Sequence, residues 1–143
     1  MGRFFPNFKL TYLIVGLVFI ILPMGLFMKG LMPSMAEFQV PKSTLDSPHY
    51  YDAILWVYIH MVVIGLLILL IGYSVENIGK QKLITVFLFL ITIFYTYLDF
   101  RSSDSNLGNA LYKGESSIVP AFISLFINFL FLQLLVKMFR NSK

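Results

Sequence analysis

Residues 53–73 read AILWVYIHMVVIGLLILLIGY, and this stretch decides the fold of the chain. It contains no Asp, Glu, Lys or Arg, and its one imidazole is His60. A hydrocarbon core about 30 Å thick is crossed by about 20 apolar residues in a helix. The stretch lacks the period-two alternation of a barrel strand, and a helix satisfies its own backbone groups in lipid. It therefore predicts a transmembrane helix.

The rest of the 143-residue chain has the same character. It is 58% hydrophobic and only 13% charged, whereas about a quarter of the residues in a soluble domain are charged. Three further apolar runs approach the length of a span: Leu10–Met28, Leu83–Leu98 and Ile118–Val136. We therefore predict an all-α integral membrane four-helix bundle. Residues 1–143 would form a single transmembrane domain with spans at 10–28, 53–73, 83–98 and 118–136.

The basic residues predict the orientation of these spans. With four spans both ends of the chain share one side, which holds seven of the 11 Lys and Arg residues and one acid, Glu76. Because segments rich in Lys and Arg stay cytoplasmic, we expect an N-in/C-in topology with two longer outer loops. The short cytoplasmic turn, Gly79-Lys80-Gln81-Lys82, predicts that spans two and three are antiparallel neighbours. The basic residues lie beside the spans, so we expect no nucleic-acid partner.

The start of the second span carries ionisable groups within the membrane. Asp52, Trp56 and His60 are spaced at i, i+4 and i+8 and share one helix face, with His60 about 12 Å below Asp52. Intramembrane ionisable residues usually face the bundle interior and are candidate sites. Structural alternatives remain open: His60 could hydrogen-bond to a neighbouring helix, and the positive end of the helix dipole accounts for Asp52.

Two further stripes of polar or small residues run along the third and fourth spans. The third carries Thr85, Thr92, Thr96 and Asp99. The fourth carries Ala121, Ser124 and Asn128. Threonine hydroxyls bond to their own helix or to a neighbouring one, so packing alone explains the first stripe. The amide of Asn128 needs a partner inside the bundle.

If these polar faces pack inward, they form one candidate ligand-binding site in the outer half of the bundle. Its members are His49, Asp52, Trp56, His60, Asp99, Arg101, Asn109 and Glu115. Such a group could ligate a divalent metal through His and carboxylate, bind a quinone or lipid headgroup, or act as a general acid and base. The spacing does not choose among these chemistries, so no catalytic residue, metal ligand or cofactor is assigned.

Several chemistries are excluded by composition and spacing. The chain has no cysteine, which excludes disulfides, thiolate nucleophiles and cysteine-ligated clusters. Its two histidines are 11 residues apart, about 16 Å along a helix, so they cannot bind one haem iron together. Walker A, dinucleotide-binding, Gly-x-Ser-x-Gly and His-Glu-x-x-His motifs are also absent.

Several short segments give the chain a family resemblance. They are His49-Tyr50-Tyr51-Asp52, Ile71-Gly72-Tyr73, Arg101, Gly108 and Glu115-Ser116-Ser117-Ile118-Val119-Pro120. With four short spans, the chain resembles the DoxX-like group of small bacterial membrane proteins. The resemblance covers most of the chain and implies a four-helix protein of the bacterial inner membrane. It also implies an accessory or quinone-proximal role.

Three functions remain open from the sequence. The leading hypothesis is a non-catalytic subunit of a membrane complex, or a bundle that binds a quinone or lipid, with a protein partner or a second copy. The rival is an enzyme acting on a lipid-soluble substrate, with Asp52, Asp99 or Glu115 as acid and base and His60 as proton relay or metal ligand. A homo-oligomeric pore ranks last, because the second span below His60 has no continuous polar stripe.

Overall fold

The computed structural model describes residues 7–37, 42–103 and 118–140, and most of these residues are helical. The helices are α1 (Phe8–Lys29), α2 (Leu31–Glu37), α3 (Lys42–Leu45), α4 (Pro48–Ser74), α5 (Ile78–Ser103) and α6 (Val119–Arg140). Helices α1, α4, α5 and α6 are long and apolar enough to cross a membrane. The predicted all-α fold with four candidate spans is confirmed, and it supports an integral, multi-pass membrane protein.

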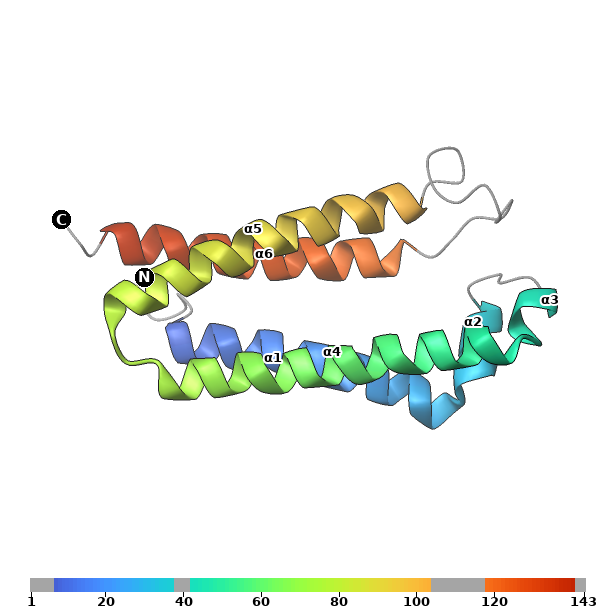
Figure 1. Ribbon diagram of the computed structural model, residues 1–143. Helices are drawn as coiled ribbons and strands as arrows, with labels where there is room; N and C mark the ends of the chain where they lie inside the picture. Colours follow the sequence, from blue (N-terminus) through green and yellow to red (C-terminus); the bar gives the residue numbers. More distant parts are fainter. Residues whose placement is uncertain (1–6, 38–41, 104–117, 141–143) are drawn as a thin grey trace.

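The four long helices form two packed pairs. Helix α1 packs against α4, α5 packs against α6, and the pairs meet mainly through α1 and α6. Figure 1 shows the two pairs as two layers. Helices α4 and α5 run in opposite directions but lie in different layers, so they do not form the packed pair that the sequence predicted. We call the end where α1 begins and α6 ends the terminal end, and the opposite end the loop end.

The turn between α4 and α5 lies earlier than the sequence predicted. Residues 79–82, the expected turn, belong to the first turns of α5, and the chain reverses over residues 75–77. The cause is Asn77, whose side chain accepts a hydrogen bond from the Lys80 amide at 3.0 Å, as a helix cap does. The Gln81 side chain also donates to the Val75 carbonyl at 2.8 Å, which holds the turn closed.

Helices α1 and α4 approach closely because glycines face each other between them. A Cβ atom placed on Gly65 would lie 2.8 Å from the Gly16 carbonyl oxygen, and one placed on Gly16 would lie 2.9 Å from the Gly65 carbonyl oxygen. At Gly72 an added Cβ would lie 2.5 Å from the Cβ of Tyr12. Small residues at a membrane helix contact let the backbones come together, and dispersion forces then stabilise the pair.

The tightly packed core lies toward the terminal end of the bundle. Its buried members come from α1, α4 and α6: Phe8, Tyr12, Val15, Ile68, Ile127, Leu130, Phe131 and Leu134. Helix α5 joins this core through the Thr85 hydroxyl, which lies 3.0 Å from the Tyr12 hydroxyl. Thr85 donates to its own helix at the Gln81 carbonyl, so Tyr12 is the donor to Thr85. Toward the loop end α1 diverges from α6 (Figure 1).

Part of the first outer loop is helical and folds back on the bundle. Gly30 ends α1 with a positive φ of 91°, and its amide donates to the Phe27 carbonyl. The turn brings α2 against α1 and α4, where Leu31 and Met35 are buried. The Tyr58 hydroxyl of α4 lies 3.9 Å from the Met35 sulfur and donates to it. The loop end of the α1–α4 pair is therefore covered by α2.

Candidate functional site

The polar stripes of α5 and α6 meet and satisfy each other. The Thr92 hydroxyl donates to the Asn128 side-chain oxygen at 2.8 Å, and the Asn128 amide donates to the Thr92 carbonyl at 3.0 Å and to the Thr96 hydroxyl. Thr96 in turn donates to the Thr92 carbonyl at 2.8 Å. The expected partner of Asn128 is therefore found. We call Thr92, Thr96, Ser124, Asn128 and Asp99 the α5–α6 ladder.

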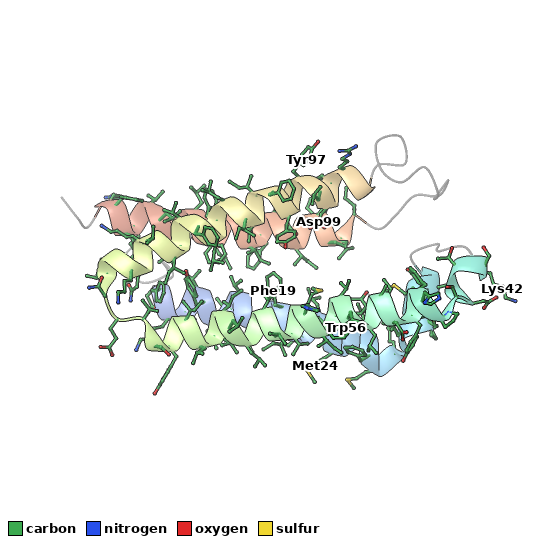
Figure 2. All side chains as sticks on the ribbon, viewed as in Figure 1. Phe19, Met24, Lys42, Trp56, Tyr97 and Asp99 are labelled. Atoms are coloured by element: carbon green, nitrogen blue, oxygen red, sulfur yellow. The ribbon has the colours of Figure 1, made fainter. Side chains whose placement is uncertain are left out.

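Asp99 forms the loop end of this ladder. It is half-buried, and its carboxylate accepts a hydrogen bond from the Ser124 hydroxyl of α6. Figure 2 shows Asp99 where α5 lies against α6, whereas Tyr97 projects away from the bundle. Arg101, two residues farther along α5, is exposed. The carboxylate thus lies at an interhelical contact.

The candidate residues of α4 lie on its outward face. His49, Asp52, Trp56 and His60 are all exposed. Around the helix, Asp52, Trp56 and His60 lie about 140° to 180° from Gly65, the residue that packs against α1. The expectation that His60 faces the bundle interior is wrong. The physical reason is that the glycine face of α4 makes the closer helix contact and turns the polar face outward.

His60 bonds within its own helix. Its Nδ1 atom lies 2.7 Å from the Trp56 carbonyl oxygen, so Nδ1 carries the proton and Nε2 points away from this contact. The Trp56 and His60 rings lie beside each other with centroids 5.5 Å apart. Figure 2 shows Trp56 and Asp99 in different layers. The structure therefore brings Trp56 and His60 together but does not bring them to Asp99.

Two members of the expected site cannot be placed. Asn109 and Glu115 lie outside the described residues. Within residues 7–37, 42–103 and 118–140, no three His, Asp or Glu side chains lie close enough to hold a metal ion together. The described members divide between the outward face of α4 and the loop end of α5.

A groove between α1 and α6 was not predicted from the sequence. It has a volume of about 560 Å³ and opens where α1 diverges from α6. Its walls are apolar: Ile14, Leu17, Val18, Ile21, Leu22, Val119, Phe122, Ile123 and Phe126. We call it the α1–α6 groove. Spans that are apolar on all sides give no periodic signal, so nothing in the sequence marks this face.

Comparison with known proteins identified no protein similar to this chain. The chain matches no protein-family model, and no curated protein or solved structure was found to match it. The resemblance to the DoxX-like group therefore remains an expectation from the sequence.

Proposed function

We propose that this protein is a non-catalytic membrane bundle that binds the lipophilic chain of a quinone or lipid in the α1–α6 groove. The observation that carries the proposal is the groove itself, with about 560 Å³ and walls of aliphatic and aromatic side chains from two helices. Its volume lies within the range of small-ligand sites, about 300 to 1,000 Å³. No charged side chain lines it, so the part of the ligand that it holds is apolar.

Shape, rather than hydrophobicity, must select the ligand. A lipid tail outside the groove is already in apolar surroundings, so burial from water contributes little. Closer packing against the groove walls supplies dispersion energy instead. A stiff, branched isoprenoid chain loses less conformational freedom on binding than a straight acyl chain does. The groove therefore favours a chain of the quinone type.

The groove can be tested by photo-crosslinking in native membranes. A photoreactive amino acid replaces Ile21 or Phe126, and the adducts are identified by mass spectrometry. We expect adducts with one class of lipophilic chain to be enriched severalfold at these positions, relative to the abundance of that class in the membrane, because the groove selects by shape. The same replacement at Leu90, which is 59% exposed on α5, samples ordinary surrounding lipid. Identical adducts at all three positions would refute the proposal.

A second candidate function is a subunit that binds a partner protein through α4. His60 lies about 12 Å below Asp52 along the span and is nevertheless exposed. A polar group facing lipid at this depth is costly, and a partner helix over Trp56 and His60 would remove the cost. Trp56, which is 63% exposed, offers a large rigid surface for such a contact.

This second candidate predicts a protein crosslink at one face. With the photoreactive residue at Trp56 or Val63, we expect a crosslinked protein band of one defined mass. The His60→Leu change should reduce its yield, because the partner helix could no longer hydrogen-bond to the Nε2 atom of His60. Leu90, exposed on α5, is the matched control position and should give lipid adducts alone. Lipid adducts alone at Trp56 and Val63 would remove this candidate.

We also propose that the protein has an N-in/C-in topology in a bacterial inner membrane. Seven of the 11 basic residues belong to the terminal side, which supports a cytoplasmic terminal end. The α1–α6 groove would then open toward the outer leaflet.

A further inference from the structure

We propose that the terminal end of α6 is a binding site for a phospholipid with a net negative headgroup. The site is separate from the α1–α6 groove. Its apolar part is a second, shallow groove of about 600 Å³ lined by Leu132, Leu135, Val136, Phe139 and Arg140. Below, these residues are called the terminal groove.

The terminal groove has the polarity of a phospholipid. Four of its five lining residues are apolar, and the fifth, Arg140, is the last residue of α6. From Leu132 to Arg140 the helix rises about 12 Å, so the groove leads from the membrane surface into the hydrocarbon layer. An acyl chain would lie along Leu132 and Val136, with its headgroup at Arg140.

A second cation reaches the same groove from α5. The Lys82 ammonium nitrogen lies 5.4 Å from the centroid of the Phe139 ring, which is part of the groove wall. The cation is attracted by the face of the ring, which holds it beside the position proposed for the headgroup. Arg140 directly follows Phe139 in the sequence and is exposed. Its planar guanidinium group offers several hydrogen-bond donors to a phosphate.

The charge around this end favours an anion over a zwitterion. The described residues there include Lys9, Lys80, Lys82, Lys137 and Arg140, with Glu76 as the one acid among them. A net negative headgroup is attracted by this field, whereas a choline headgroup brings its own positive charge. Charge complementarity therefore selects an anionic phospholipid, and the apolar wall holds one of its chains.

The test compares retained lipids on the full-length protein by native mass spectrometry. Micelles contain phosphatidylglycerol and phosphatidylcholine in equal amounts, and the measured quantity is the ratio of the two bound lipids. For the wild type we expect phosphatidylglycerol to dominate. The Lys82→Gln and Arg140→Gln changes should each lower the ratio about fivefold, and together about 25-fold.

A control double variant distinguishes a specific binding site from general attraction by the positive charge at this end. Lys9→Gln with Lys80→Gln removes the same charge from the same end but leaves the terminal groove intact, and it should change the ratio less than twofold. A Val136→Trp variant, which fills the groove and keeps both cations, should also lose bound phosphatidylglycerol. Equal loss in the control pair, or no preference in the wild type, would overturn the proposal.

Discussion

Replacing Gly65 with valine is expected to separate α1 from α4 and to lower the free energy of unfolding by about 3 kcal/mol. The first side-chain carbon alone would lie 2.8 Å from the Gly16 carbonyl oxygen and 2.7 Å from Ile20. The carbonyl belongs to the backbone of α1, so a side-chain rotation cannot relieve the clash and the helices must move apart. Denaturant titration in mixed micelles, followed by circular dichroism, measures the loss.

Gly25 offers a matched control on α1. A Cβ atom placed there meets nothing within 4 Å. Gly25→Val should therefore leave the free energy of unfolding unchanged or raise it by about 0.5 kcal/mol, since valine has a higher helix propensity than glycine. If Gly65→Val and Gly25→Val behaved alike, the close packing of α1 on α4 would be wrong.

Replacing Asn128 with leucine is expected to lower the free energy of unfolding by about 2 kcal/mol. Three hydrogen bonds join Asn128 to Thr92 and Thr96 across the α5–α6 contact. Measured hydrogen bonds between membrane helices average about 0.6 kcal/mol each, so their combined loss is about 2 kcal/mol. The same denaturant titration applies.

The loss should stay moderate because the threonines keep other partners. Without Asn128, the single hydroxyl proton of Thr92 is left to the Phe89 carbonyl, and Thr96 still donates to the Thr92 carbonyl. Gln133→Leu makes the same change from amide to leucine on α6, outside the ladder, and should cost less than 0.5 kcal/mol. A loss at Gln133 as large as at Asn128 would show that the ladder does not stabilise the α5–α6 pair.

The polar stripe on the third span shows how much of the helix packing can be predicted from the sequence. The spacing of Thr85, Thr92, Thr96 and Asp99 predicts one face, and the structure places that face against other helices. This prediction is confirmed because polar groups in the hydrocarbon layer find hydrogen-bond partners only within the protein. The same expectation failed for His60, because the glycine face of α4 packs against α1 and turns the face that carries His60 outward.

Helix pairing shows what the residues alone do not reveal. The short α4–α5 turn suggests that these helices pack together, yet α4 packs on α1 and α5 on α6. A short turn requires only that two helix ends be near. The tight fit of Gly16, Gly65 and Gly72 decides which faces meet, and this fit depends on two distant segments at once.

Composition and the length of the apolar runs were enough to predict four helices long and apolar enough to cross a membrane, because a helix satisfies its own backbone groups in lipid. They also predict that most of the basic residues gather on the side where the chain begins and ends. Tertiary structure alone decided that the spans form two pairs, that His60 faces outward, and that apolar grooves open beside α6. Hydrophobicity places a helix in the bilayer without choosing its neighbour, and steric fit and hydrogen bonds make that choice.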